Sequence, residues 1–349
     1  MTKSTTPRIG RGWSISNSLP KLEKLLIRSF DSNKGRFFWQ FLDDREPSRA
    51  NLAPHPQPLA SNPVFIPNGL NLIYTSVDGI SAYSFQNEQA ALIFPMDMDL
   101  HTVDGLSVSP DASTLYFVRT KWNKPLSNAI TEVGLGGGRV RIAPIAIDVI
   151  TLEIHSGTIN CNPIPGLPVS LSFPPSSSEV YVLTHDGRLS HINLGNSHMT
   201  ELARLSPNSR INVSRDDSLL AWQLDDSGFN RVSKRGTSTV SPFGWFPSEP
   251  PDGSKIGFTR GSNEFWLKDG ARDSELVLAL PKSDSLRYDT PTWSPSGKNI
   301  AVNLMGGPHP DKTFSLTLID TVSRTITMVP HDEISLVGGR IWIPTDVTL

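Results

Sequence analysis

The segment PTWSPSGKNIAV, residues 291–302, consists of an apolar strand, a tight turn of Ser, Pro and Gly, and a second apolar strand. The same phrase recurs at 63–74, 106–118, 171–183, 211–222, 247–258 and 340–349. The copies, indexed by their turn residues, are 43, 65, 40, 36, 44 and 49 residues apart; these residues are Pro67, Pro110, Pro175, Arg215, Pro251, Pro295 and Pro344. Such a period is typical of propeller blades. The sequence therefore predicts an all-β, seven-bladed β-propeller.

The second strand of each copy begins in the same register. The residue five places after the index position is apolar in six copies: Leu72, Leu115, Val180, Leu220, Ile256 and Ile300. Blade three is the clearest copy, because Asp186-Gly187 separates two alternating strands and is a strong hairpin signal. Seven blades of about 45 residues use nearly all of the 349 residues, so we expect 1–349 to be a single domain.

The last copy has only its first strand before Leu349, so its other strands must come from elsewhere. The stretch GRFFWQFLDD, residues 35–44, is strand-like, and we expect it to close the last blade and remove exposed sheet edges. Residues 1–34 form an N-terminal extension. Within it, Leu22, Leu25 and Leu26 have helical spacing and predict a short helix between Pro20 and Phe30.

The second blade is longer than the others, and the extra residues fall in a Gly-rich insertion at 121–142. Long insertions of this kind are either functional lids or flexible hairpins, and both remain open.

Composition limits the possible partners. The net charge is −2 with no basic block, which disfavours nucleic-acid binding. The sequence contains no apolar run long enough to span a membrane and begins without a secretory signal, so we expect a cytoplasmic protein. We also expect a monomer. Cys161 is the only cysteine, which excludes an internal disulfide and a cysteine cluster for zinc, and we expect it to be buried.

Three copies of the repeat resemble one known family. The run DTPTWSPSGKNIAV (289–302) resembles the TolB-type, WD-repeat-like propeller repeat, and EPPDGSKIGFTR (249–260) and VSPDASTLYFVRT (108–120) are similar. Related propellers occur in a periplasmic translocation protein, in prolyl-oligopeptidase-like peptidases and in oligogalacturonate lyases. This chain has no Gly-x-Ser-x-Gly motif and no room for a hydrolase domain, and no lyase residue can be carried over. The resemblance implies a fold and leaves the activity open.

Propeller geometry places the loops that enter the innermost strands, and those between second and third strands, on one face around the channel mouth. We expect the functional residues in these loops. The ligand-binding candidates are Arg119, Trp122, Arg210, Arg287, Tyr288, Asp289 and Arg340, and Trp13 is a further aromatic candidate. The candidate catalytic acids or bases are His101, His309 and His331. The candidate metal ligands are His55, Asp97, Asp99, His101 and His309.

Two functions follow from this pattern. The favoured one is a non-catalytic propeller that binds a protein or a small ligand at its loop face, with no cofactor. The alternative is an enzyme, such as a lyase, cyclase or hydrolase, with its site at the channel mouth and possible dependence on a divalent metal.

Overall fold

A computed structural model describes the protein in segments. The described residues are 7–16, 25–31, 36–42, 48–50, 63–66, 71–84, 86–87, 89–109, 111–126, 144–174, 178–196, 198–214, 218–223, 227–233, 236–261, 263–270, 272–280, 287–288, 291–306, 313–329 and 334–342. They fall into two compact units. One is Met1–Ala50 with Arg204–Thr345, and the other is Asn51–Ala203 with Asp346–Leu349.

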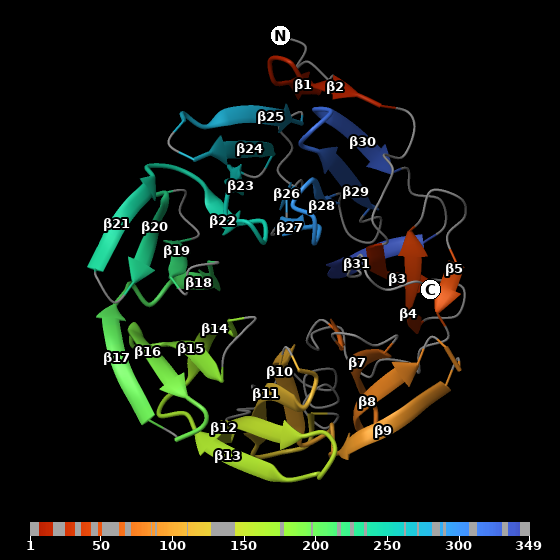
Figure 1. Ribbon diagram of the computed structural model, residues 1–349, viewed down its shortest axis with the longest axis vertical. Coiled ribbons are helices and arrows are strands. Elements are labelled where there is room, and N and C mark those ends of the chain that lie inside the picture. The colour runs from red at the N-terminus through yellow and green to blue at the C-terminus, as the bar shows by residue number, and fades with distance from the viewer. Residues whose placement is uncertain are drawn as a thin grey trace, which may run out of the picture. The chain divides into compact units, whose positions relative to one another are not determined.

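All of the elements that the structure delimits are β-strands, and they form seven sheets. Three sheets belong to the unit that begins at Asn51 (Figure 1). Their strand orders are β6 (Val64–Phe65), β7 (Asn71–Ser76), β8 (Gly79–Ser84), β9 (Gln89–Pro95); β10 (His101–Val108), β11 (Thr114–Trp122), β12 (Pro144–Glu153), β13 (Ile159–Pro163); and β14 (Pro168–Ser172), β15 (Glu179–Thr184), β16 (Arg188–Asn193), β17 (His198–Arg204).

Four sheets belong to the other unit. Their strand orders are β18 (Ser209–Val213), β19 (Leu219–Gln223), β20 (Phe229–Ser233), β21 (Gly236–Ser241); β1 (Arg8–Ile9), β25 (Glu275–Ala279), β24 (Glu264–Asp269), β23 (Lys255–Arg260), β22 (Trp245–Ser248); β2 (Ser14–Ile15), β30 (Thr325–Val329), β29 (Thr313–Asp320), β28 (Asn299–Gly306), β26 (Arg287–Tyr288), with β27 (Thr292–Trp293) also on β28; and β31 (Ile334–Trp342), β3 (Leu25–Asp31), β4 (Arg36–Leu42), β5 (Ser48–Ala50). The all-β prediction is confirmed, whereas the number of blades and the single domain stay predictions.

A common hairpin joins the first and second strands of several sheets. The backbone N–H of Ser109 donates to the carbonyl of Thr114 at 2.9 Å, and that of Ser294 donates to Asn299 at 2.8 Å. The two side-chain hydroxyls accept in return from the N–H groups of Thr114 and Asn299. The repeated Ser-Pro turn is therefore a local closure that fixes the register of the next strand.

That register buries the second strand along most of its length. The apolar residues predicted to share one position are all buried: Leu72, Leu115, Val180, Leu220, Ile256 and Ile300. Their neighbours along the strands are buried as well, so β7, β15 and β19 contain runs of at least four consecutive buried residues. Successive side chains point to opposite faces of a sheet, so both faces of these strands are covered.

The fourth strand of the repeat is exposed in some sheets and partly buried in others. In β9 and β17 the first four residues are exposed, as expected for a strand at the rim of a sheet. In β25 and β30, by contrast, three and two residues respectively are buried. The N-terminal residues 7–16 account for this difference, because β1 pairs with β25 and β2 pairs with β30 in parallel (Figure 1).

Residues 7–16 form a strap across two sheets, anchored by Trp13. This side chain is only 7% exposed and belongs to one buried cluster with Val277 of β25 and Ile326 of β30. The guanidinium of Arg324 lies 4.8 Å from the centre of the indole ring and forms an ion pair with Glu275 at 2.6 Å. Trp13 is therefore a core residue, and the prediction that it contacts a ligand is wrong.

Gly10 permits this close approach. A Cβ atom at position 10 would lie 1.7 Å from the backbone oxygen of Leu276 in β25, so no other residue fits there without moving the strap.

The chain ends meet in one sheet, as predicted. Strand β3 pairs antiparallel with β31 on one side and with β4 on the other, so the strand at 36–42 completes the sheet that contains the C-terminal strand. The predicted helix is wrong where the structure describes it, since Leu25–Asp31 is a strand. Residues 17–24, which include Leu22, lie outside the described residues. The short run LLIRSF is apolar enough to form either a helix or a strand. Its pairing with β31 and β4 makes it a strand.

The burial of Cys161 and the absence of a membrane-spanning segment were also expected from the sequence. Cys161 lies on the outer strand β13 and is exposed, so the prediction of a buried thiol is wrong. Within the described residues, no helix is long and apolar enough to cross a membrane.

The strap predicts a large stability effect at Trp13. Replacing Trp13 with Ala should lower the free energy of unfolding by about 3 kcal/mol or more, because it leaves a cavity between two sheets and frees the strap. The measurement is urea unfolding followed by circular dichroism. Arg11→Ala, at an exposed position of the same strap, is the control and should stay within about 0.5 kcal/mol of the wild type. Equal effects of the two substitutions would contradict an anchoring role.

Candidate functional site

Three of the predicted site residues lie together at one end of the sheet β10–β13. In the antiparallel pair of β10 and β11, His101 is opposite Lys121 and Val103 is opposite Arg119. Arg119, Lys121 and Trp122 belong to strand β11, so the prediction that they lie in a loop is wrong. The strand continues further than the sequence suggested, into the first residues of the insertion. Residues 127–143 of the insertion lie outside the described residues.

These residues divide between the two faces of the sheet. Cross-strand partners share a face, and successive residues alternate between faces. His101 and Arg119 therefore share the face of Val103, which packs in a cluster with Ile73 and Ile80. The indole Nε1 of Trp122 donates to the hydroxyl of Thr102 at 3.2 Å, which puts Trp122 on the opposite face.

Arg119 forms an ion pair with a carboxylate on the same face of the sheet. Its guanidinium donates to the Oδ2 atom of Asp148 in β12 at 2.9 Å, and the side chains are 26% and 16% exposed. The two residues are direct cross-strand partners. A ligand anion at Arg119 would therefore compete with a half-buried carboxylate.

The turn before β10 orients His101. Asp97 accepts the backbone N–H of Asp99 on its carboxylate at 3.0 Å, and its carbonyl oxygen lies 2.9 Å from Nδ1 of His101. Because a carbonyl oxygen only accepts, Nδ1 carries a proton in this contact, and Nε2 is the acceptor of the neutral ring.

The predicted metal ligands that belong to the described residues do not form a cluster. Across the described part of the chain, no group of three or more His, Cys, Asp or Glu side chains is arranged to hold a metal ion. Asp97, Asp99 and His101 belong to that part, whereas His55 and His309 lie outside it. A metal site that includes the two histidines stays a prediction.

Asp104 lies on the same face of β10 as Thr102, and its carboxyl group has an altered pKa. The surrounding protein desolvates its carboxyl group and raises the pKa above the usual value for Asp, although the residue is exposed. Among the described residues, it has no hydrogen-bond or ion-pair partner. A carboxyl group with a raised pKa that solvent still reaches is characteristic of functional sites.

A β-bulge directs the Asp104 side chain. The pairing of β10 with β11 shifts register between Asp104 and Ser107, and Gly105 in this interval has a φ of 64°. A Cβ atom on Gly105 would lie 2.7 Å from the ring of Phe173. The bulge thus requires glycine, and bulges often re-aim side chains beside functional sites.

The remaining candidates lie elsewhere. Arg210 belongs to β18 in the other unit, where its guanidinium donates to the carbonyl of Ser209 at 2.9 Å. Arg287 and Tyr288 form β26, and Arg340 belongs to β31, so these residues too are in strands instead of the predicted loops. Asp289 and His331 lie outside the described residues. Their roles stay predictions.

Two polar residues at this site were not among the candidates. Asp148 interrupts the apolar strand IAIDVI, and Thr102 alternates with the apolar Val103. A polar residue inside an otherwise apolar strand could have pointed to this site. That pattern can be recognised only once the boundaries of the strand are known.

Solved structures with the same arrangement of strands identify the fold. No family model matches the chain, and no curated protein matches it. Among solved structures, an oligogalacturonate lyase from Vibrio parahaemolyticus matches with 12% identity and a TM-score of 0.58, over 90% of this chain and 91% of that one. An oligogalacturonate lyase in complex with manganese matches with 12% identity and a TM-score of 0.61, over 89% and 90%.

A puromycin-hydrolyzing peptidase from Mycobacterium tuberculosis matches with 12% identity and a TM-score of 0.62, over 92% of this chain and 54% of that one. The chain has the β-propeller fold. At this level of identity the likeness shows the fold alone, and membership of the TolB-type family stays a prediction.

The raised pKa of Asp104 predicts a pH-dependent stability effect. The folded protein binds the Asp104 proton more tightly than the unfolded chain, so stability falls as pH rises through the two pKa values. Asp104→Asn removes this cost and should be more stable than the wild type at pH 7, with the difference vanishing at about pH 3, below the usual Asp pKa of about 3.9. Urea unfolding at both pH values measures this.

Asp186→Asn is the control with the opposite sign. The Thr184 hydroxyl and Arg188 lower the pKa of Asp186, so this carboxylate stabilises the fold above the usual Asp pKa. The control should be less stable than the wild type at pH 7. A D104N variant that loses stability at pH 7, as D186N does, would contradict the desolvation of Asp104.

Proposed function

We propose that this propeller binds a small polyhydroxylated ligand, such as a saccharide, at the end of the sheet β10–β13. The observation that carries the proposal is the row of Trp122, Thr102 and Asp104 on one face of two paired strands. Thr102 and Asp104 are two residues apart in β10, which corresponds to about 7 Å along a strand.

The Trp122 indole supplies a flat apolar surface. Its bond to the Thr102 hydroxyl fixes the ring orientation, and the side chain is half-buried, so part of the ring remains accessible. A fixed aromatic ring offers a large contact area at low entropic cost, which suits the apolar face of a sugar ring.

Asp104 supplies directional bonding beside that ring. A carboxylate accepts hydrogen bonds from ligand hydroxyls, and protonation, which the raised pKa favours, allows it to donate as well. Because the described residues place no cation on Asp104, its bonding capacity is available to a ligand. Nearby negative charge on the ligand would be disfavoured, so we favour neutral saccharides over acidic ones.

A second candidate is an enzyme at the same position. The raised pKa of Asp104 suits a general acid, and two of the structural neighbours are named as lyases and one as a peptidase. The proposed catalytic residues His101, His309 and His331, and a divalent metal such as the manganese of one neighbour, belong to this alternative. A protein partner at this face and a monomeric state are also proposals.

The test is calorimetric titration of the full chain with neutral oligosaccharides and with oligogalacturonate. We expect binding of a neutral saccharide that weakens about tenfold or more in Trp122→Ala, through lost stacking, and in Asp104→Asn, because an NH2 group replaces one acceptor oxygen and the negative charge is lost. Trp245→Ala is the matched control, because Trp245 is also half-buried and donates through Nε1, to Gly261 at 2.8 Å in the other unit.

The outcomes separate the candidates. Equal loss in the Trp122 and Trp245 variants, or no saccharide binding by the wild type, would overturn the proposal. Cleavage of oligogalacturonate, followed by ultraviolet absorbance of an unsaturated product and by manganese analysis of the purified protein, would favour the enzyme.

A further inference from the structure

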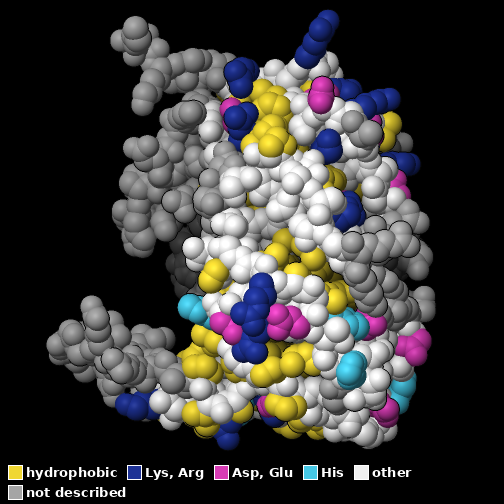
Figure 2. Space-filling model, turned by 90° about the vertical axis from the view of Figure 1, so that its left-hand side faces the viewer, with side chains coloured by type: hydrophobic (Ala, Val, Ile, Leu, Met, Phe, Trp, Pro, Cys, Tyr) yellow, Lys and Arg dark blue, Asp and Glu magenta, His cyan; other side chains and the backbone are white. Residues whose placement is uncertain are grey.

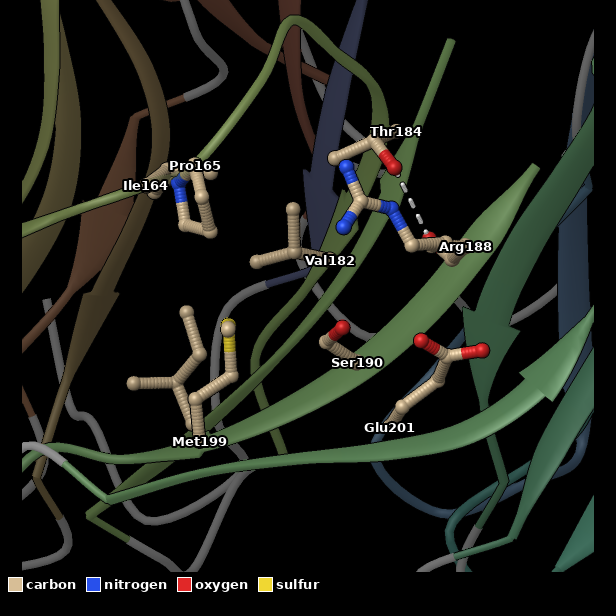
Figure 3. A pocket seen from close by; sticks show the side chains of 9 residues that line it. Ile164, Pro165, Val182, Thr184, Arg188, Ser190, Met199 and Glu201 are labelled. Carbon is tan, nitrogen blue, oxygen red and sulfur yellow. Dashed lines mark hydrogen bonds between the residues drawn. The ribbon is translucent and has the colours of Figure 1, made fainter. Parts of the chain in front are cut away.

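A pocket lies on the sheet β14–β17, lined by none of the residues Trp122, Thr102 and Asp104. It is bounded by strands β15, β16 and β17 and by Ile164 and Pro165, which follow β13, and it comprises about 350 Å³ of space that is open to solvent (Figure 3). Water-sized molecules can occupy only about 40 Å³ of this space, so the pocket is a small, shallow one. None of its lining residues was a candidate in the sequence.

The floor of the pocket is apolar and buried. Ile164, Val182 and Ile192 are buried and belong to the cluster that joins this sheet to β11 and β12. Met199 on the outer strand β17 is exposed and forms part of the wall. On the face that Figure 2 shows, hydrophobic side chains reach the surface, with basic and acidic side chains among them.

Ser190 is a buried polar group directed into this pocket. Its residue is 8% exposed, and its hydroxyl points toward the space below Arg188 in Figure 3. Among the described residues, the hydroxyl has no hydrogen-bond partner. Because the pocket is open to solvent, water or a bound molecule supplies the hydrogen bond that the protein does not.

Arg188 is held over the same space. Its Nε donates to Oδ2 of Asp186 at 2.6 Å, and its carbonyl accepts from the Thr184 hydroxyl at 3.1 Å. Gly187, with a φ of 81°, completes this hairpin. In Figure 3 the terminal nitrogens of the guanidinium extend toward Val182, over the pocket, and they make no hydrogen bond to other described residues. Two terminal N–H groups in one plane match a carboxylate.

We propose that this pocket binds a short aliphatic monocarboxylate. The carboxylate accepts from the terminal nitrogens of Arg188 and from the Ser190 hydroxyl, and the alkyl chain lies on Ile164, Val182 and Met199. Glu201 on β17 also lines the pocket, so a second negative charge on the ligand is repelled. The small pocket suits a short alkyl chain, part of which stays in solvent. This site is independent of the saccharide site at Trp122.

The experiment is NMR titration of the full chain with hexanoate, with acetate and hexylamine as comparison probes. Hexanoate should bind more tightly than acetate, which lacks the alkyl contact, and hexylamine should not compete with it. Arg188→Gln, which keeps the side-chain length, should weaken hexanoate binding about tenfold or more, and Ser190→Ala should weaken it about threefold or more.

Arg272→Gln is the matched control, since Arg272 also pairs with a nearby Asp, at 3.2 Å from Asp269, but lies away from this pocket in the other unit. Thermal unfolding of each variant confirms that it is folded. Hexylamine binding as tight as hexanoate, unchanged affinity in Arg188→Gln, or an equal loss in Arg272→Gln would overturn the proposal. Trp122→Ala should leave hexanoate binding unchanged, which keeps this result distinct from the test of the saccharide site.

Discussion

The double-sided burial of the second strand in each sheet is the constraint on which the rest of the structure depends. Strands such as β7, β15 and β19 bury consecutive residues, so each needs apolar neighbours above and below its sheet. A single four-stranded sheet has no second layer to provide them. Sheets must therefore pack face to face with other sheets of the same kind, and a chain of near-identical repeats supplies them in sequence. The Ser-Pro hairpin contributes by fixing the register, because a slip of one residue would exchange the two faces.

Sheet edges pose the complementary problem. Outer strands such as β9 and β17 leave their first residues exposed, and β17 carries charged side chains, which discourage pairing with another chain. Strands β25 and β30 instead bury apolar residues at the rim, and that burial is possible because residues 7–16 pair with both edges. The same segment bridges two sheets through Trp13 and the Arg324–Glu275 ion pair. The N-terminal extension is thus part of the fold as well as a connection to the closing strands.

The features of the fold that recur in every copy of the repeat could be predicted from the sequence, whereas the features that occur only once could not. The register of Leu72 through Ile300 followed from alignment of the copies, and the closing strand at 36–42 followed from the incomplete last copy. The helix prediction at Leu25 failed because six apolar-rich residues satisfy both periods, and the deciding partners, β31 and β4, lie outside the local window. At the site, Trp122 was identified from its type, but the division of Arg119 and Trp122 between two faces depends on strand boundaries.

Both proposed sites occupy positions where packing alone would favour another residue. Asp104 retains a carboxyl that the surrounding protein desolvates, and Ser190 retains a hydroxyl without a protein partner among the described residues, next to the apolar floor of its pocket. Each position costs stability that an amide or an alanine would not cost. Near both, a residue with fixed geometry faces the same space, the Trp122 indole held by Thr102 and the Arg188 guanidinium held by Asp186. A polar group without a protein partner, next to a residue of fixed geometry, is what a preorganised binding site requires, because a ligand can bond to it without reordering the protein.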